Sequence, residues 1–481
     1  MRKAFNNILI TMTLAVVLTT VSSCKKYLDI PYPNNSINTK SAFTNMATID
    51  GMMNNLYYSF FNTAAVSAGL YYVLPCTADE GYNPTSVSLS LDPQTSNITA
   101  NLFLVSWDNV YNNIYQANVM LESIPGATAP GFTDDKKKAY TAAAKTIRAY
   151  DYFLLVRIFG DVPLITNTDV PFNSLKPRDP AATVYAAIEK DLQDAIAALP
   201  ATLGIKYFIN NKYIPEAILA EVYLTEGKWA QAEAAATDII GSNQYQLAAL
   251  TDIFLQSSKE GILESAPAYA FFNSAISYKV GRINRNTWFP EGFYRSYLEG
   301  DAPALSPDLL NSFEAGDQRL VNWVTLRNAN NYSNPNNRMF PYKYKYSYVY
   351  YTGTIPAGRE ENDKVIRLAE IYLLRAEVRT RQNNLTGATA DLNIIRTRAG
   401  LANTTASSQS DIIDAVLNER RHELFFEGGW RWFDLVRTGK ANSVLSAISY
   451  KSANWKPYMV LFPLSPANLA ANPNLTQTPG Y

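Results

Sequence analysis

The spacing of apolar residues along the chain predicts a mainly helical protein. In residues 105–124, apolar side chains recur every three or four positions, which places them on one face of a helix. The same period predicts helices over residues 41–60, 134–159 and 184–199. Proline or glycine directly follows three of these segments and supports the predicted helix ends.

A pair of helices is repeated in the sequence. Residues 219–224 read LAEVYL, and residues 368–373 read LAEIYL. In each copy a turn leads into a second helix, over residues 229–240 in the first and 386–398 in the second. Helix pairs with small residues at the contact and Gly or Asn in the turn are typical of tetratricopeptide repeats. Chance similarity between amphipathic helices is the alternative. Because the copies lie far apart, we expect an insertion between them rather than a tandem array.

The inserted residues 243–362 have a different composition, with aromatic residues among Asn, Ser, Gly and Pro. Within them, residues 340–350 alternate Phe or Tyr with Pro, Lys, Ser and Val. This period of two predicts a β-strand with its aromatic face towards the core and its lysines on the wet face. Residues 69–101 are rich in Ser, Thr, Asn, Pro and Gly, so we expect loops there.

The N-terminal segment is typical of a lipoprotein signal. A basic start precedes an apolar run over residues 8–21, which is too short to cross a bilayer comfortably. Small residues are then followed directly by Cys24, as in the lipobox of bacterial lipoproteins, where that cysteine carries lipid. An ordinary secretory signal with a chance cysteine is the alternative. We expect a signal peptide over residues 1–23 and a lipidated N-terminus and tether over residues 24–40.

The 481 residues are enough for a large core, and we expect one domain over residues 41–481. Its helical scaffold is predicted over residues 41–242 and 363–440. A loop-rich, ligand-binding part with short strands is predicted over residues 243–362, followed by a C-terminal tail over residues 441–481.

Charge and composition exclude several classes of function. Lys plus Arg is 42 and Asp plus Glu is 42, so no broad basic field exists to bind nucleic acid. His422 is the single histidine, and lipid on Cys24 leaves Cys76 alone. A disulfide in the mature chain and a His- or Cys-rich zinc site are therefore excluded. We expect Cys76 to be a small buried apolar residue, and we expect no cofactor and no metal. Carboxylate chemistry and ligand binding remain.

The densest motif lies near the C-terminus, where residues 418–440 read NERRHELFFEGGWRWFDLVRTGK. Its acidic and basic residues fall at helical spacings that allow pairing at i,i+4, and aromatic residues surround them. We interpret the segment as a buried ion-pair network. Arginine holds neighbouring carboxylates ionised, whereas an acid catalyst needs a raised pKa, so a structural role is favoured, including for His422.

This segment resembles the C-terminal signature of the SusD/RagB family of outer-membrane nutrient-binding lipoproteins. Residues 148–164, 392–401 and 461–481 are similar to the family's long helix and its exit, the end of its repeat helix and its terminal tail. The resemblance implies a scaffold of tetratricopeptide-like helix pairs that is lipid-anchored at the cell surface. It also implies a non-enzymatic protein that binds glycans, or sometimes peptides, and passes them to a SusC-like TonB-dependent outer-membrane transporter.

The resemblance places the ligand site in variable loops rather than in the strong motifs. Pyranose rings stack on flat aromatic side chains, and their hydroxyls need polar partners. The candidates in the matching loops are Asp79, Tyr82, Trp288, Tyr294 and Trp323, for each of which a core position is an equal alternative. Two other functions remain open: a surface glycoside hydrolase with paired carboxylates, and a tetratricopeptide scaffold that binds only protein.

Overall fold

The computed structural model describes residues 39–62, 69–82, 107–204, 208–265, 304–325, 339–345 and 356–481. Helices predominate in these residues, which confirms the predicted class. The α-helices are α3 (Thr39–Ala42), α4 (Met46–Phe60), α5 (Leu74–Thr77), α6 (Trp107–Ser123), α7 (Asp134–Phe159), α8 (Val170–Asn173), α9 (Ala181–Ala198), α10 (Tyr213–Glu226), α11 (Trp229–Gly241), α14 (Pro307–Ser312), α15 (Gln318–Trp323), α16 (Leu368–Arg381), α17 (Leu385–Arg398), α18 (Gln409–Leu424), α19 (Trp430–Arg437), α20 (Ala441–Leu445) and α21 (Pro466–Ala471). The π- and 3-10 segments are η2 (Gly69–Val73), η4 (Ile124–Gly126) and η8 (Pro457–Val460). The strands are β1 (Gly81–Tyr82), β2 (Gly261–Ser265), β3 (Ala304–Leu305), β4 (Val324–Thr325), β5 (Phe340–Pro341) and β6 (Asp363–Arg367).

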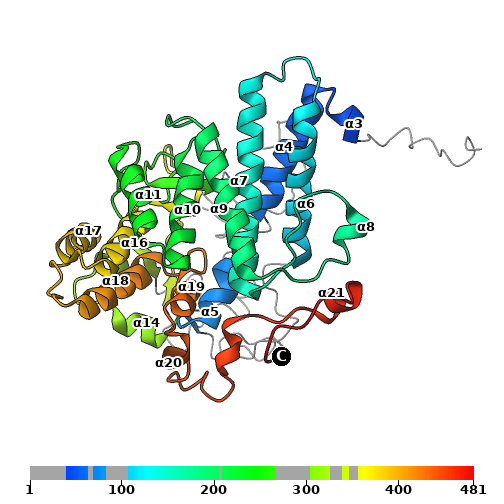
Figure 1. Ribbon diagram of the computed structural model, residues 1–481. Coiled ribbons are helices and arrows are strands. Elements are labelled where there is room, and N and C mark those ends of the chain that lie inside the picture. Colours follow the sequence, from blue (N-terminus) through cyan, green and yellow to red (C-terminus); the bar gives the residue numbers. More distant parts are fainter. Residues whose placement is uncertain are drawn as a thin grey trace, which may run out of the picture.

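Packed helices build the N-terminal half of the molecule. α6 packs on α7, α7 on α9, and α4 on α6 (Figure 1). α7 has the bounds that the sequence predicts: Thr133 caps its first turn by accepting from the Lys136 backbone N–H at 3.3 Å, and Gly160 ends it with a φ of 74°. The predicted helix over residues 41–60 is divided into α3 and α4, because the side chain of Asn45 caps a new helix start.

The two repeated helix pairs meet in space. α10 packs on α11 and α16 on α17, and α11 packs against α16, so α9, α10, α11, α16, α17 and α18 form one continuous array (Figure 1). Arg379 of α16 supports this junction, with its Nε 2.8 Å from Glu233 Oε1 of α11. The two copies are therefore separated along the sequence, as expected, but they lie next to each other in space.

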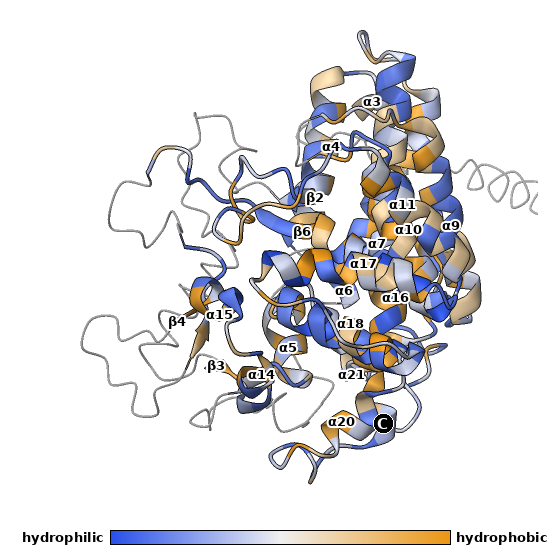
Figure 2. Cartoon of the chain, turned by 90° about the vertical axis from the view of Figure 1, so that its left-hand side faces the viewer, coloured by the Kyte–Doolittle hydropathy of each residue, from blue (hydrophilic) through white to orange (hydrophobic). Residues whose placement is uncertain are grey.

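Short strands pair segments that lie far apart in the sequence. Among the described residues, β1 pairs with β3, β2 with β6, and β4 with β5, all antiparallel. Gly261 of β2 lies opposite Arg367 of β6, directly before α16 begins, so this pair returns the chain to the array. Figure 2 shows β3, β4, α14 and α15 to one side of the helices.

The loops predicted over residues 69–101 are wrong for residues 69–82. These residues form η2, α5 and β1, because their apolar side chains pack into the core, where Leu74 is fully buried. Residues 83–101 lie outside the described residues.

The strand predicted over residues 340–350 is observed only at Phe340–Pro341. The expectation of lysines on a wet face is wrong for Lys343. This side chain is buried, and its Nζ lies 2.5 Å from Glu427 Oε1, which compensates the buried charge. Residues 346–350 lie outside the described part of the chain.

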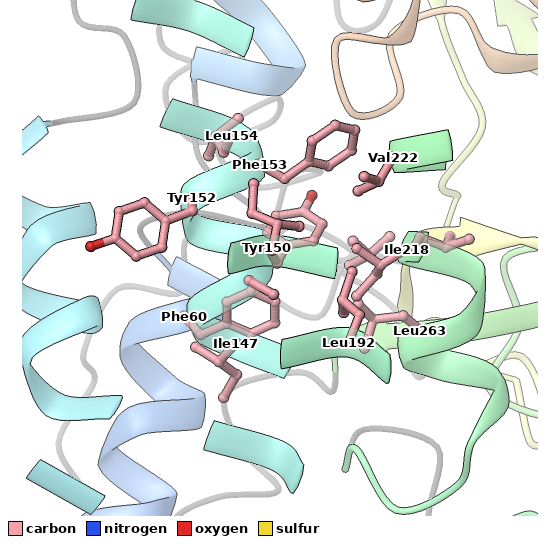
Figure 3. Close-up of a cluster of buried hydrophobic side chains, with 14 of the residues drawn as sticks. Phe60, Ile147, Tyr150, Tyr152, Phe153, Leu154, Leu192, Ile218, Val222 and Leu263 are labelled. Atoms are coloured by element: carbon pink, nitrogen blue, oxygen red, sulfur yellow. The ribbon is translucent and has the colours of Figure 1, made fainter. Parts of the chain in front are cut away.

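Most buried apolar side chains form one core between the helices of the N-terminal half and the array. Phe60 of α4 meets Tyr150 of α7 edge to face, with ring centroids 5.3 Å apart. A second core surrounds Trp323, and a third lies between α16, α17 and α18. Cys76 is buried, as expected. Figure 3 shows the centre of the first core, with Phe60, Ile147, Tyr150, Tyr152, Phe153, Leu154, Leu192, Ile218, Val222 and Leu263.

Candidate ligand-binding site

The segment from α5 to β1 carries the candidates Asp79 and Tyr82. Its backbone is held by β3 and by the residue that follows β3: Gly81 pairs with Leu305, and Ser306 Oγ donates to the Asp79 carbonyl at 2.6 Å. It also packs closely against α19. A Cβ on Gly429, which has a φ of 69°, would lie 2.7 Å from Leu74 Cδ1, so glycine is required for this approach. The Gly-Gly of the C-terminal motif therefore helps to position this segment.

Asp79 is buried in an ion-pair cluster. Arg431 binds its carboxylate at 2.7 and 2.8 Å, and Arg421 NH2 lies 3.0 Å from Asp79 Oδ2. Burial opposes ionisation of Asp79, but the two guanidinium groups outweigh it and lower its pKa to about 2. Asp79 is only 2% exposed, and its oxygens face arginine. Its predicted contact with ligand stays a prediction that requires this cluster to open.

Glu80 has the opposite electrostatic environment. Burial, with a further contribution from neighbouring Asp79, raises the pKa of Glu80 to about 8, although the Phe426 backbone N–H donates to its Oε2 at 3.1 Å. Two carboxyls with pKa values pushed apart are what a glycosidase needs. Both Asp79 and Glu80 are buried, however, so neither presents an acid to a sugar in solution.

Tyr82 lies in a setting that suits stacking on a sugar. Its ring and that of Tyr450 are both half-buried, with centroids 4.7 Å apart and an interplanar angle of 39°. The next residue, Lys451, is fully buried and donates to the carbonyls of Cys76 and Thr77 at 2.7 and 3.1 Å. These bonds hold Tyr450 beside the segment that carries Tyr82. Sequence reasoning missed Tyr450, because no local pattern relates it to a segment that far away along the chain.

Trp323 lies at the centre of the second core. Its side chain is 0% exposed, and its indole N–H donates to the Leu250 carbonyl at 2.9 Å. The ammonium of Lys343 lies 4.7 Å from its ring centroid. Burial lowers the pKa of Lys343 to about 8, against the favourable charge of Glu427. These are the surroundings of a core residue, and the ligand role of Trp323 stays a prediction.

The ion-pair network predicted over residues 418–440 is present and buried. Arg367 Nε lies 2.9 Å from Glu427 Oε2, and Arg367 NH1 lies 2.5 Å from Glu423 Oε1 and 3.0 Å from Glu260 Oε1. Arg319 NH1 adds Glu419 at 2.7 Å. These partners come from β6, α15 and the segment before β2 rather than from i,i+4 positions of one helix. The pair within one helix is Arg437 with Asp434 of α19, three residues apart, at 2.7 Å. Glu427 also lies beyond the end of α18.

His422 has a structural environment, as expected. It is 4% exposed, its Nε2 lies 2.8 Å from Ser312 Oγ, and its ring stacks on Phe313 with centroids 4.4 Å apart. Burial and the positive charges of Arg319 and Arg421 lower its pKa to about 3. The imidazole is therefore neutral across the physiological range and does not act as a pH switch there.

The remaining candidates, Trp288, Tyr294 and Cys24, lie outside the described residues. In the part of the chain that the structure covers, no group of three or more His, Cys, Asp or Glu side chains is placed to hold a metal ion. None of the helices described is both long and apolar enough to span a membrane.

Comparison with known proteins gives a consistent result. One family model, described as "SusD family", matches residues 282–481, and a second, described as "Starch-binding associating with outer membrane", matches residues 26–224. The SusD-like protein P38 of Formosa agariphila is 26% identical to this chain, and the alignment covers 100% of both. A SusD-like protein of Bacteroides ovatus is 23% identical, over 75% of this chain and 69% of its own length.

Solved structures show the same fold. A laminarin-binding SusD-like protein has a TM-score of 0.72 and 25% identity, covering 91% of this chain and 100% of its own. A SusD superfamily protein of Parabacteroides distasonis has a TM-score of 0.73 at 22% identity, covering 93% of this chain and 100% of its own.

Proposed function

This chain belongs to the SusD/RagB family, and from that premise we propose that it binds a glycan at the cell surface without cleaving it. The similarity to the laminarin-binding protein over 91% of the chain supports a carbohydrate ligand. We propose further that the protein is lipid-anchored in the outer membrane through Cys24. Captured oligosaccharide then passes to a SusC-like TonB-dependent transporter beside it.

The observation that carries the proposed binding is the ring pair formed by Tyr82 and Tyr450. Two half-buried rings lie side by side at an angle of 39°, and sugar C–H faces stack on aromatic rings. The rings are held from behind by the buried bonds of Lys451 and by the pairing of β1 with β3. A rigid platform loses little conformational entropy when ligand binds. We propose that Trp288 and Tyr294 belong to the same ligand-binding region, whereas Asp79 and Trp323 are buried and would contact a ligand only if their surroundings open.

Titration calorimetry with a panel of oligosaccharides, including laminarin fragments, tests the platform. We expect Tyr82→Ala to weaken binding at least tenfold without lowering the melting temperature much, because the ring is half-buried at the end of a two-residue strand. Tyr115→Ala is the matched control, because Tyr115 is 41% exposed on α6. Equal affinities for the Tyr82→Ala and wild-type proteins would remove the platform from the site.

Two further measurements test the rest of the proposal. Purified protein is expected to release no reducing sugar from the glycan that it binds, and steady hydrolysis lost on substitution of one acid would instead establish a glycosidase. Cys24→Ser is expected to release the protein from membranes, because the substitution removes the site that carries the acyl chains and firm anchoring needs several such chains. Co-purification of a TonB-dependent transporter with the lipidated protein tests delivery.

A further inference from the structure

The repeated motif brings two buried glutamates into contact. Glu221 of α10 and Glu370 of α16 are the third residues of the sequences LAEVYL and LAEIYL. α10 packs on α16, and the side chains of Glu221 and Glu370 hydrogen-bond to each other. The two residues are only 3% and 1% exposed. The same position of each repeat therefore brings its acid to one site in the core.

Among the described residues, Arg420 of α18 provides the ion pair to this site. Its NH2 lies 3.6 Å from Glu221 Oε1, which is too far for a hydrogen bond, and its Nε binds Asp434 Oδ2 at 2.8 Å. Arg420 is fully buried, as the two glutamates are. A single guanidinium that is shared with Asp434 can balance the charge of one of the two carboxyls, but not of both.

Three further arginines act on the two glutamates through their charge but have partners elsewhere: Arg157 of α7, Arg367 of β6 and Arg437 of α19. Arg157 lies between the rings of Phe153 and Phe433, 3.8 Å from each centroid, and Arg437 NH2 binds Glu377 Oε2 at 2.6 Å. Arg367 binds the carboxylates of the C-terminal network. α11 and α17 also pack on α16, but their acids pair with other arginines of that helix: Glu233 with Arg379, and Asp391 with Arg375 and Arg379.

Two carboxyls in contact in the core are held together best by one proton. If both were ionised, two like charges would meet where water cannot screen them. Burial and then the charge of Glu221 raise the pKa of Glu370 well above its ordinary value, against the opposing charges of Arg420 and Arg367. A protonated Glu370 donates to the Glu221 carboxylate, so a repulsive contact becomes a hydrogen bond.

We propose that Glu370 keeps its proton at neutral pH and donates it to Glu221, so that one shared proton joins the two repeats. The contact between α10 and α16 is then a pH-sensitive joint within the helical array. Loss of the proton in alkaline solution leaves two negative charges in contact and weakens this joint. The joint lies in the scaffold and is independent of the proposed glycan binding, which Tyr82→Ala tests separately.

Chemical denaturation of wild type, Glu370→Gln and Glu221→Gln between about pH 5 and about pH 9 tests the shared proton. In this range the folded wild type holds a proton that the unfolded chain releases. Its unfolding equilibrium constant should therefore rise with pH, relative to that of a variant without the pair, by up to about tenfold per pH unit. Either substitution leaves one carboxyl beside Arg420, so we expect both variants to gain stability over wild type as pH rises. The gain should be larger in Glu370→Gln, because burial also acts on Glu370.

Glu377→Gln is the matched control on the same helix. Glu377 is also fully buried, and burial opposes its ionisation, but the arginines around it, Arg437 foremost, lower its pKa to about 2. This carboxyl is ionised in the folded and the unfolded chain throughout the range, so we expect a loss of stability by the same factor at every pH. Infrared spectra at pH 7 give a second readout. The C=O band of a protonated carboxyl is expected to lose intensity in Glu370→Gln but not in Glu377→Gln.

A constant ratio of the unfolding constants of wild type and Glu370→Gln at every pH would overturn the proposal, and so would an unchanged carboxyl band in Glu370→Gln. A gain in Glu370→Gln that is absent from Glu221→Gln would show that Glu370 holds its proton through burial alone, without sharing it. Circular dichroism verifies that each variant folds. If Glu370→Gln does not fold, Glu221→Gln decides, because a pH-independent ratio to wild type would then refute the shared proton.

Discussion

Arg367 provides a sharp test of the buried ion-pair network. Its side chain is 1% exposed and contacts three carboxylates, those of Glu260, Glu423 and Glu427, at 3.0, 2.5 and 2.9 Å. Removing one partner of a buried pair leaves uncompensated charge and costs about 3–5 kcal/mol. Arg398 and Lys343 still face these carboxylates after Arg367→Met, so we expect a loss near the lower figure, about 3 kcal/mol.

Chemical denaturation of the two proteins, with thermal melting as a second probe, measures this loss. The matched control is Lys440→Met, which removes an exposed pair with Asp414 and is expected to change stability by about 1 kcal/mol or less. A loss for Arg367→Met no larger than that of the control would refute the reasoning.

The pH dependence gives a second test of the Arg367 prediction. Neighbouring arginines, Arg398 and Arg367 foremost, lower the pKa of Glu423 against the effect of burial. A lowered folded-state pKa contributes stability that is present above the ordinary carboxyl pKa and lost as pH falls towards the folded value. Without Arg367 this contribution shrinks, so the deficit of the variant is expected to be largest near pH 7 and to narrow below about pH 4.5, where carboxyls begin to protonate. A deficit that is constant across that range would contradict this account.

Three further predictions concern substitutions of single residues. In the folded protein the pKa of Glu80 is raised to about 8. Between the ordinary carboxyl pKa and this value, Glu80 is protonated in the folded protein but ionised in the unfolded chain. The stability of the wild-type protein therefore falls as pH rises through this range. Glu80→Gln is therefore expected to gain stability over wild type by up to about 1.4 kcal/mol per pH unit between pH 5 and 8 in denaturation curves, and a difference independent of pH would disprove this. Trp323→Ala is expected to lose about 3–5 kcal/mol of stability, because the ring is fully buried, and a stable variant that only loses glycan affinity would instead place Trp323 in the ligand site. Gly160→Ala is expected to lower the melting temperature more than Gly131→Ala does. Both glycines have a positive φ, but only at Gly160 does the added Cβ meet a side chain, Leu461 Cδ1 at 2.9 Å. Equal effects would show that only the backbone strain of a positive φ matters.

The predicted helices follow from local sequence. The period of apolar residues and the capping residues place α7 at its observed bounds and the other predicted helices within a few residues, apart from the break before Met46, because helix ends depend on adjacent side chains. The same holds for the buried ion-pair network within residues 418–440. A dense set of charges among aromatic residues leaves few stable environments other than a paired network.

Local sequence did not determine which partners complete that network. Glu423 meets arginines from β6, α15 and α17, and Asp79 meets Arg431 and Arg421 from α19 and α18. Each contact joins residues far apart in the chain. The burial of Lys343 was missed for the same reason, because the alternating pattern around it carries no sign of Glu427.

The family resemblance, the helical class and the helix pairs could all be predicted from the sequence, because period, caps and motif order are properties of neighbouring residues. The joining of the two repeats into one array through α11 and α16 could not be predicted in this way, because that contact depends on how the intervening chain returns through β2 and β6. Packing likewise buries Asp79 and Trp323 while it leaves Tyr82 half-buried, with its ring tilted against that of Tyr450. Whether an aromatic or acidic side chain is buried or half-exposed depends on distant elements that cover it, and those elements are set by packing rather than by local pattern.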